Sequence, residues 1–482
     1  MRLITSFLIF ILVTTTSAQT IDKQLYDAYD KFKEVTLKDR RFKHADLQPL
    51  INALKENDLF KVEKIGESIQ GRDITLLSIG SGETSVLLWS QMHGNESTAT
   101  MALFDIFNLF ESEDFEEFKN NLFRKLTIHF VPMLNPDGAE LFTRRNALGV
   151  DLNRDAQRLE SSEAQILKWI RDRLDADFGF NLHDQSRYYT VGHSPNPATI
   201  SFLAPAYNYP KDINEVRGDA MKVIGKMNDV IQKYAPNQVA KYDDAFEPRA
   251  FGDNIQKWGT STILIESGGY QNDREKQEIR KLNFMGILSA LEVIADKTYE
   301  SEDFSKYEAL PFNERQLFDL KIENLTYQLG GKEYTVDAAI NHFEMEYDDH
   351  SKYYFYSSIQ ELGDLSIYYG FETLDATGLT YSKGKVLETP VAYYGIKDLD
   401  FMGLLKRGIT HVRSNDIPAN VRYTDHPIGV LRGDRSLNDA MALGSHSTFL
   451  LNKGGVPRYA VINGFLIDLN KGEAKVVNGV VR

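Results

Sequence analysis

The spacing of apolar residues divides the chain into two parts with different patterns. Up to about residue 300, short apolar runs alternate with longer amphipathic stretches. The runs predict strands at residues 74–80, 85–92, 126–134, 178–183, 199–206 and 261–267. The amphipathic stretches predict helices at residues 21–35, 47–57, 99–111, 162–174, 216–234 and 273–296. Buried strands that alternate with helices are typical of an α/β domain with a largely parallel or mixed sheet.

The second part of the chain has a different pattern. Residues 297–315 are polar and aperiodic, which is typical of a linker. Beyond them, apolar runs are separated by Gly and Asn, as in residues 327–336 and 451–469, and this pattern indicates hairpins. We therefore predict an α/β domain at residues 19–300, a linker at 301–312 and a β-rich accessory domain of unknown role at 313–482.

The first residues have the pattern of a secretory signal peptide. Arg2 precedes an apolar run at residues 3–13, and small residues at 16–18 offer a cleavage site before Gln19. We therefore expect residues 1–18 to direct export to the periplasm or the medium. No later stretch reaches about 18 uninterrupted apolar residues, so no membrane span is expected.

Composition narrows the function classes. The chain has 482 residues and a net charge of −14, which argues against a nucleic-acid partner. Cysteine is absent from the sequence. That absence excludes thiolate metal sites, cysteine nucleophiles and a lipid-modified N-terminal cysteine, so the exported protein is not expected to be a lipoprotein.

Polar residues follow several of the predicted strands at the point where each strand ends. His93 and Glu96 follow the strand at 85–92, His183 ends the strand at 178–183, and Glu266 lies near the end of the strand at 261–267. Sites in open α/β sheets form outside the carboxyl ends of the strands. We therefore expect these side chains to share one cleft.

The residue types in this cleft indicate metal chemistry. Two imidazoles and one carboxylate, from His93, Glu96 and His183, suit a catalytic zinc ion with one open position for water. A carboxylate beside such an ion takes the proton of the water, and Glu266 is the candidate. The alternative is that Glu266 pairs with an arginine, because an unpaired buried carboxylate is costly.

A cluster of donors lies between these motifs in the sequence. It contains Arg144, Arg145, Asn146, Asn153 and Arg154. Arginine forks bind carboxylates through two hydrogen bonds, so the cluster predicts an anion pocket near the metal. The alternative is a solvated charged face. The neighbouring Asp151 is a candidate acceptor for a ligating histidine, whose tautomer it would fix.

Six motifs occur in an order that resembles the zinc metallocarboxypeptidase family, of the carboxypeptidase A-like, exported bacterial type. They are GESIQGRDI (66–74), HGNE (93–96), NPDG (135–138), RRNALGVDLNRD (144–155), NLHD (181–184) and ILIESGG (263–269). The resemblance covers about residues 60 to 290. It implies a mixed, mostly parallel eight-stranded sheet flanked by helices, one zinc ion per chain, and peptide substrates with a free C-terminal carboxylate.

The resemblance also implies a role for each matching residue. His93, Glu96 and His183 would be zinc ligands, and Glu266 would be the general base. Arg144 would stabilise the oxyanion of the tetrahedral intermediate and contribute to substrate binding. Asn153 and Arg154 would bind the terminal carboxylate of the substrate, and Asp151 would hold His93.

The sequence also departs from the family pattern. Asp184-Gln185 stands where the digestive enzymes have Ser-Tyr. The mobile tyrosine of the family has Tyr242 as its candidate here, with Tyr188 and Tyr189 as rivals. In the region that shapes the side-chain pocket, Phe251 favours an apolar C-terminal residue and Asp253 a basic one.

Three alternatives keep the same cleft. An aspartoacylase-like deacylase shares the histidine, glutamate and DLNR pattern and would cleave N-acyl amino acids. A cell-wall peptide hydrolase would use the same chemistry on peptides that also end in free carboxylates. A zinc-binding scaffold without activity is disfavoured, because ligands, base and anion donors are all retained.

Overall fold

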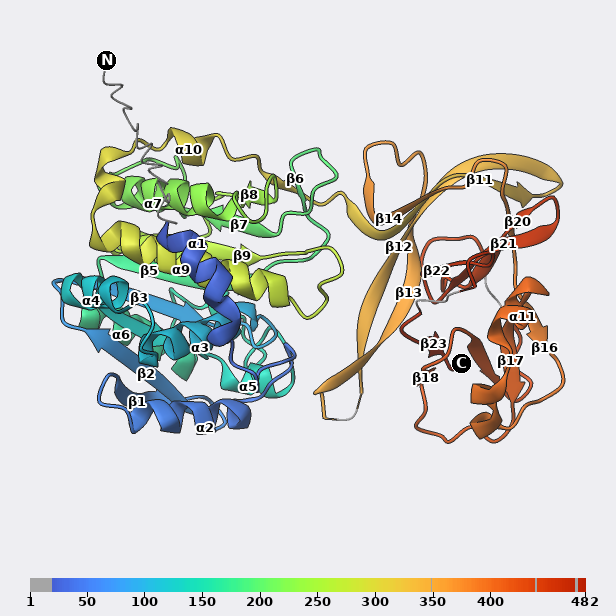
Figure 1. Ribbon diagram of the computed structural model, residues 1–482, viewed down its shortest axis with the longest axis horizontal. Coiled ribbons are helices and arrows are strands. Elements are labelled where there is room, and N and C mark those ends of the chain that lie inside the picture. Colours follow the sequence, from blue (N-terminus) through green and yellow to red (C-terminus); the bar gives the residue numbers. More distant parts are fainter. Residues whose placement is uncertain (1–19, 348, 438–439, 473–475) are drawn as a thin grey trace, which may run out of the picture.

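The computed structural model describes residues 20–347, 349–437, 440–472 and 476–482, and it has an N-terminal and a C-terminal part (Figure 1). The predicted signal peptide, residues 1–18, lies outside the described residues. No helix in the described part of the chain is long and apolar enough to span a membrane.

The N-terminal part is built on an eight-stranded sheet in the order β1-β2-β4-β3-β5-β9-β7-β8. The strands are β1 (Lys61–Glu67), β2 (Asp73–Gly80), β3 (Thr84–Ser90), β4 (Leu126–Val131), β5 (Phe178–Asp184), β7 (Ile200–Leu203), β8 (Val239–Lys241) and β9 (Ser261–Ser267). The central neighbours β4-β3-β5-β9 are parallel, whereas β1-β2, β2-β4 and β7-β9 are antiparallel. The predicted mixed sheet is therefore confirmed.

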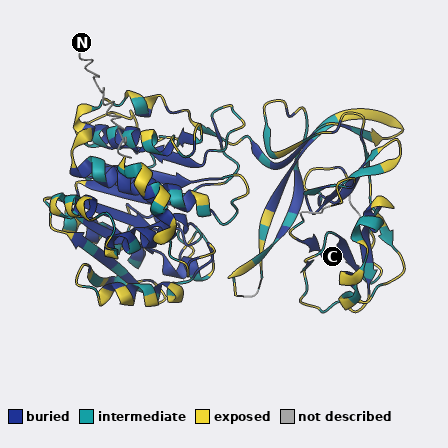
Figure 2. Cartoon of the chain, viewed as in Figure 1, coloured by how far each residue is buried: buried dark blue, intermediate teal, exposed yellow. Residues whose placement is uncertain are grey.

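Helices cover both faces of this sheet (Figure 1). The helical segments are α1 (Ile21–Ala28), η1 (Tyr29–Lys31), α2 (His44–Lys55), α3 (Thr98–Glu111), α4 (Glu116–Lys125), α5 (Pro136–Glu140), η2 (Leu152–Arg154), α6 (Ser162–Leu174), α7 (Glu215–Ile231), α8 (Phe251–Lys257) and α9 (Gln277–Ala295). One apolar core lies under α1, α3, α7 and α9, and another lies under α6 and α8. The strands between them are buried (Figure 2), which explains why they are almost continuously apolar.

A buried ion pair fixes the N-terminal segment to this domain. Arg280 on α9 pairs with Asp105 on α3, and both side chains are 0% exposed. The same guanidinium donates hydrogen bonds to the carbonyls of Leu37 (2.6 Å) and Glu34 (3.0 Å). Breaking such a pair from one side costs about 3–5 kcal/mol. These bonds hold residues 34–37 in place. Arg40 and Arg41, a few residues further along, can therefore reach the C-terminal part.

The structure corrects the predicted linker at 301–312. This stretch continues the N-terminal domain through η3 (Thr298–Ser301), α10 (Ser305–Glu308) and β10 (Asn313–Glu314). Tyr307 is 2% exposed, and its hydroxyl accepts a hydrogen bond from the backbone N–H of Ala204 (3.2 Å). Strand β10 pairs with β6 (Thr190–Val191). The polar, aperiodic composition of the stretch concealed the few apolar side chains that attach it.

The C-terminal part begins at β11 and is β-rich, as predicted. Its main sheet contains β11 (Leu317–Leu329), β12 (Lys332–Tyr347), β13 (Lys352–Gly363), β14 (Tyr369–Asp375), β15 (Thr380–Ser382), β20 (Phe449–Lys453), β21 (Val456–Ile462) and β22 (Phe465–Asp468). The expected hairpin at 327–336 is the β11–β12 turn, where Gly330 and Gly331 have φ of 60° and 79°. Such positive φ values favour glycine.

The C-terminal part also contains a smaller α/β layer, which the sequence did not predict. Strands β16 (Lys385–Leu387), β17 (Ile409–Ser414) and β19 (Gly429–Arg432) form a parallel sheet. It lies beside η4 (Tyr393–Asp398) and α11 (Phe401–Lys406), and β18 (Tyr423–Thr424) pairs with β23 (Gly479–Val480). These elements are too short to leave a clear periodic pattern.

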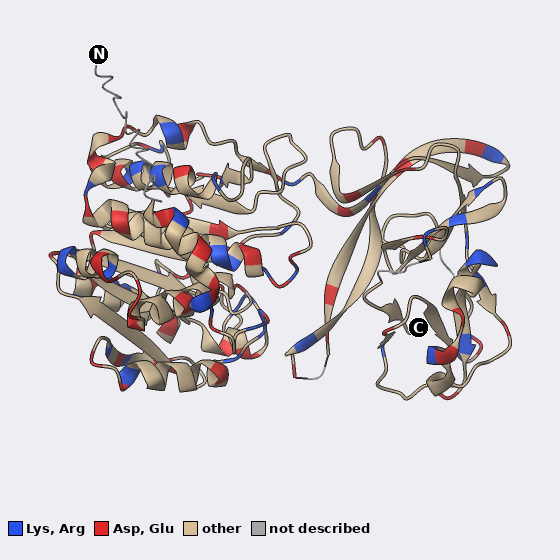
Figure 3. Cartoon of the chain, viewed as in Figure 1, with Lys and Arg blue, Asp and Glu red and all other residues tan. Residues whose placement is uncertain are grey.

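Charged groups join the two parts. Arg41 pairs with Glu344 (2.9 Å) and Glu346 (3.0 Å) on β12, and Arg40 also pairs with Glu344. Acidic and basic residues are interspersed over both parts of the molecule (Figure 3). The charged contacts between the two parts are therefore individual ion pairs. They are not an attraction between one acidic surface and one basic surface.

Candidate metal centre and cleft

The sheet brings the predicted metal ligands together at one edge. His93 and Glu96 lie between β3 and α3, whereas His183 is on β5. Glu266 is on β9, in register with His183. Because β3, β5 and β9 are parallel neighbours, their carboxyl ends deliver these side chains to one cleft. The cleft has a volume of about 490 Å³.

Three donor groups converge as a metal site requires. The Nδ1 atom of His93 lies 2.8 Å from Glu96 Oε1, and the Nδ1 atom of His183 lies 2.7 Å from Glu96 Oε2. The two Nδ1 atoms are 3.1 Å apart. All three side chains are buried, and their ligand atoms lie within 4.8 Å of one another. Two imidazoles and one carboxylate in this arrangement fit zinc.

The orientation of His93 is set from behind by Asp151. His93 Nε2 lies 3.0 Å from Asp151 Oδ1, which leaves Nδ1 facing the other donors. Arg144 Nε donates to the second oxygen of Asp151 (3.0 Å). Burial alone would raise the pKa of Asp151, but the hydrogen bonds and charges of His93 and Arg144 hold that pKa well below its usual range. Asp151 therefore remains an acceptor for His93.

Glu266 lies in the same cleft as a second, separate carboxylate. It is 8% exposed, and its Oε2 atom is buried without a hydrogen-bond partner among the described residues. Burial, followed by the nearby charges of Glu96 and Asp184, raises the pKa of Glu266 well above its usual value. The expected alternative, an arginine partner, is not found in the described residues. A carboxylate held in this way is poised to accept a proton.

The donor cluster divides between the cleft and its surroundings. Arg144, Asn153 and Arg154 line the cleft. Arg145 instead donates to the carbonyl of Gly149 (3.0 Å), and Asn146 donates to Glu163 (3.2 Å). Only three members of the predicted anion pocket therefore face the metal site.

The amide of Asn153 is oriented by the backbone. Its Oδ1 atom accepts a hydrogen bond from the N–H of Phe251 (2.8 Å), which leaves the NH₂ group as a donor. Arg154 lies nearby, with Nε 3.4 Å from Glu247 Oε2. An amide donor and a guanidinium together provide a site for a carboxylate.

Two of the sequence motifs support the site without entering it. Asp137, in NPDG, accepts hydrogen bonds from Ser68 Oγ (2.7 Å), the N–H of Gln70 (2.9 Å) and Arg72 Nη1 (2.7 Å). A Cβ atom on Gly94 would lie 2.0 Å from the backbone of Gly138. This close contact requires glycine and packs the loop that carries His93 against α5.

The tyrosine candidates occupy different places. Tyr242 and Tyr189 line the cleft. The charge of Glu266, and then burial, raise the pKa of Tyr242. Tyr188 instead donates to Asp319 (2.6 Å) in the C-terminal part. Tyr188 is therefore an interface residue and no longer a rival of Tyr242.

The sequence left the preferred C-terminal residue open between two indications, Phe251 and Asp253. The structure places these two residues differently. Phe251 is 0% exposed and belongs to the apolar core under α8, whereas Asp253 lines the cleft. Burial raises the pKa of Asp253 to about 7, although its Oδ1 accepts a hydrogen bond from the N–H of Glu247 (2.9 Å). Of these two residues, the acidic one therefore lines the cleft.

Sequence reasoning missed a buried lysine beside the catalytic candidates. Lys276 is 8% exposed, and its Nζ donates to Asp184 Oδ2 (3.1 Å) and to the carbonyl of Ser267 (2.8 Å). Asp184 also donates its backbone N–H to Glu96 (3.1 Å). A lysine next to the start of a helix is usually exposed to solvent. The local sequence therefore did not indicate that Lys276 is buried beside Asp184.

A second cavity, of about 450 Å³, adjoins the cleft on the side of the C-terminal part. Glu96 and Asp184 line both spaces. The far wall includes His342, Phe343 and Glu344 of β12. The accessory domain therefore contributes to the surroundings of the metal site.

The N-terminal part is therefore an α/β domain whose donor set, two histidines and one glutamate, suits a catalytic zinc ion. Residues 50–259 match the family model described as zinc carboxypeptidase. The matched residues are less than half of the chain, so the match shows that the N-terminal domain is similar to zinc carboxypeptidases, as the sequence motifs indicated.

Individual relatives are distant. The carboxypeptidase SOL1 of Arabidopsis thaliana is 25% identical over 179 residues, which are 31% of this chain and 36% of that protein. The human carboxypeptidase N catalytic chain is 29% identical over 144 residues, which are 24% of this chain and 31% of that protein. The chain thus spans less than half the length of these curated relatives. A metallo-carboxypeptidase from Burkholderia cenocepacia has 18% identity and a TM-score of 0.44, covering 53% of this chain and 70% of that structure.

Proposed function

We propose that this protein is an exported zinc carboxypeptidase that removes the C-terminal residue of peptides. The observation that carries the proposal is the arrangement of one cleft. It combines the His93, Glu96 and His183 donor set with Glu266, whose buried Oε2 atom has no hydrogen-bond partner among the described residues. The anion donors Asn153 and Arg154 line the same space.

The chain's own residues supply most of the chemistry. Asn153 and Arg154 bind the terminal carboxylate and thereby place the last peptide bond beside the metal site. Glu266 takes a proton from the attacking water and returns it to the leaving amine. Arg144, whose Nη1 lies 3.0 Å from Glu96 Oε1, provides positive charge for the developing oxyanion. Tyr242 lines the same cleft and is the candidate for a further contact with the substrate.

Zinc is the cofactor that this donor set would hold. When bound, zinc supplies a Lewis acid and lowers the pKa of water to about 7. We propose one ion per chain, because the described residues contain one cluster of this kind. Zinc content measured on the purified protein tests this number directly.

Residues 1–18 support export as part of the proposal, through the N-terminal pattern described above. Sequencing of the mature N-terminus is expected to begin at Gln19. An intact Met1 on protein from the periplasm or the medium would contradict this part alone.

A small substrate panel tests the reaction. It contains blocked dipeptides with free C-termini, the same peptides amidated, N-acetyl-aspartate and a cell-wall stem peptide. Chelator-sensitive cleavage only where the peptide has a free C-terminus supports the proposal. Cleavage of N-acetyl-aspartate alone would favour a deacylase, and cleavage of the stem peptide alone would favour a cell-wall hydrolase.

Replacing Arg154 by Ala is expected to weaken binding of the terminal carboxylate. We expect KM for free-C-terminus peptides to rise about 10- to 100-fold, since a charge-assisted hydrogen bond contributes about 1.5–3 kcal/mol. Steady-state kinetics on the free and amidated peptides measure the change. Arg145→Ala is the matched control, because Arg145 lies in the same segment and bonds to Gly149 instead. Equal losses on amidated peptides would rule out the carboxylate role.

The pKa of Asp253, about 7, predicts a pH-dependent preference for basic C-terminal residues. Below pH 7 the carboxyl is mostly protonated, whereas above pH 7 it is ionised and attracts a cation. The ratio of kcat/KM for C-terminal Arg over the neutral citrulline is therefore expected to rise about tenfold between pH 6 and pH 8. Asp253→Asn should flatten this rise, and Asp243→Asn, on another part of the cleft wall, should keep it. A flat ratio in the unmodified protein would exclude Asp253 as the specificity residue.

A further inference from the structure

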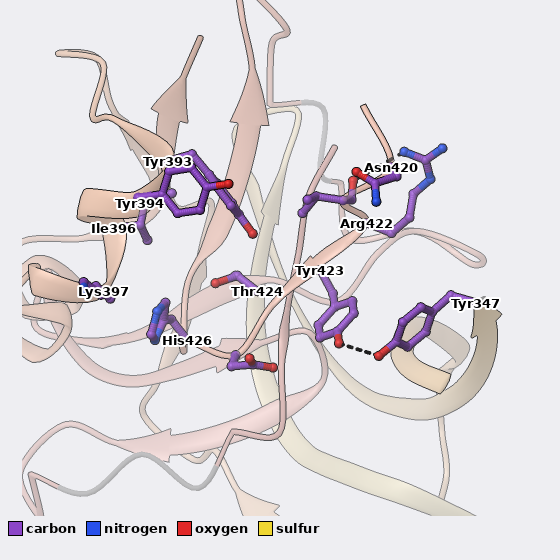
Figure 4. Close-up of a pocket in the computed structure, with 12 residues that line it drawn as sticks. Tyr347, Tyr393, Tyr394, Ile396, Lys397, Asn420, Arg422, Tyr423, Thr424 and His426 are labelled. Atoms are coloured by element: carbon purple, nitrogen blue, oxygen red, sulfur yellow. Dashed lines mark hydrogen bonds between the residues drawn. The ribbon is translucent and has the colours of Figure 1, made fainter. Parts of the chain in front are cut away.

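The C-terminal part contains a pocket that the proposed peptidase reaction does not use. It has a volume of about 400 Å³ and lies between η4, the segment at residues 420–426 and the end of β12. Tyr393 and Tyr394 lie on one side, and Tyr347 and Tyr423 on the other (Figure 4). No feature of the metal centre explains four tyrosines around one hollow.

The rings are held in place by one another. Tyr394 is 74% exposed and contacts Tyr393 edge to face, with ring centroids 5.3 Å apart. Across the pocket, Tyr423 stacks on Tyr354 at 5.3 Å and 10°, and its hydroxyl lies 2.9 Å from that of Tyr347. A fixed aromatic surface binds a ligand without a large loss of side-chain freedom.

Polar side chains line the pocket together with the tyrosines. Lys397, Asn420 and Asp425 line the pocket and are exposed. Within the described residues, their side chains make no hydrogen bond or ion pair with the protein. They therefore offer an ammonium, an amide and a carboxylate to a ligand, in a pocket that also contains four tyrosine rings.

This combination suits a ligand with an apolar face and a polar rim. A purely apolar ligand would bury the three polar side chains without partners, which is unfavourable. A nucleic acid is disfavoured by the net charge of −14. A pyranose ring presents C–H groups on its face and hydroxyls around its edge, and thus matches tyrosine rings beside amide and carboxylate groups. We propose that this pocket binds an oligosaccharide.

The position of the pocket relates it to the interface between the two parts of the chain. Tyr347 is the last residue of β12, and Glu344 on the same strand pairs with Arg41 of the N-terminal domain. Three residues of a strand span about 10 Å. Residues an odd number apart on a strand point to opposite faces, so a glycan in the pocket would lie near the domain interface but on the other face of β12. Binding itself does not depend on peptidase activity.

The test uses the full-length protein and two Tyr→Ala variants. Tyr394→Ala removes the exposed ring of the pocket. Tyr209→Ala is the matched control, because Tyr209 is also 74% exposed and also contacts one ring, Phe246, edge to face at 5.1 Å. The probes are tetrasaccharides of glucose and of N-acetylglucosamine, titrated by calorimetry, and purified peptidoglycan in a co-sedimentation assay.

We expect the unmodified protein to bind at least one probe, and Tyr394→Ala to weaken that binding at least tenfold. Tyr209→Ala should bind as the unmodified protein does, and all three proteins should cleave a short peptide equally. Asn420→Ala, which leaves every ring in place, should weaken the same binding. Absence of binding to all probes at 10 mM, or equal binding by the two tyrosine variants, would overturn the proposal. Capture of unglycosylated peptides with no response to the sugars would overturn it as well.

Discussion

Replacing Glu266 by Gln is expected to leave zinc bound and to remove nearly all peptide hydrolysis. Glu266 is not one of the three converging donors, so the metal site stays intact. The amide of glutamine cannot accept the proton that the reaction releases. General-base catalysis contributes about 10²- to 10⁴-fold, and we expect kcat to fall by that factor.

Single-turnover kinetics and zinc content, measured on the same preparation, check this expectation. Glu292→Gln is the control, because Glu292 on α9 is a partly buried glutamate whose pKa is likewise raised, mainly by burial. It lies outside the cleft and should retain full activity. Substantial turnover by Glu266→Gln would show that another group is the base.

Replacing His183 by Ala is expected to abolish zinc binding at stoichiometric concentrations and activity with it. His183 Nδ1 faces Glu96 Oε2 at 2.7 Å, so its loss leaves two donors. Zinc contributes several kcal/mol of transition-state stabilisation, which corresponds to a loss of about 10³-fold or more. Chelator treatment of the unmodified protein should cause the same loss of activity. Added zinc should restore activity to the chelator-treated unmodified protein and not to His183→Ala.

His129→Ala provides the comparison for this variant. His129 is a buried histidine on β4 of the same sheet, and its ring bonds to Ser78 (2.8 Å) outside the cleft. Atomic absorption should find zinc in His129→Ala and not in His183→Ala. Zinc retained by His183→Ala at equal occupancy would remove His183 from the ligand set.

The cleft could be predicted because the carboxyl ends of neighbouring parallel strands lie at the same edge of a sheet. Once β3, β5 and β9 are recognised as buried strands, their polar terminal residues must meet at one edge of the sheet. His93, Glu96, His183 and Glu266 could therefore be assigned to one cleft from the sequence. Their spacing in the sequence, by contrast, carries no distance information.

Other features depend on contacts that local patterns do not encode. The burial of Lys276 is set by Asp184, which is 92 residues earlier in the chain. Phe251 and Asp253 are two residues apart, and only the way α8 packs decides which of them lines the cleft. Residues 301–312 are polar enough to suggest a linker, yet the single buried ring of Tyr307 helps attach them to the first domain.

The pairing of Arg40 and Arg41 with β12 has a consequence for the order of folding. Arg40 and Glu344 are separated by 304 residues along the chain. During synthesis, the first domain can assemble while the acidic partners of both arginines are still missing, because domains fold as units. Long-range closure comes late and slowly. We therefore expect the outer wall of the cavity beside the candidate metal site to be among the last parts of the molecule to form, which leaves the newly made N-terminal domain with an open flank for a time.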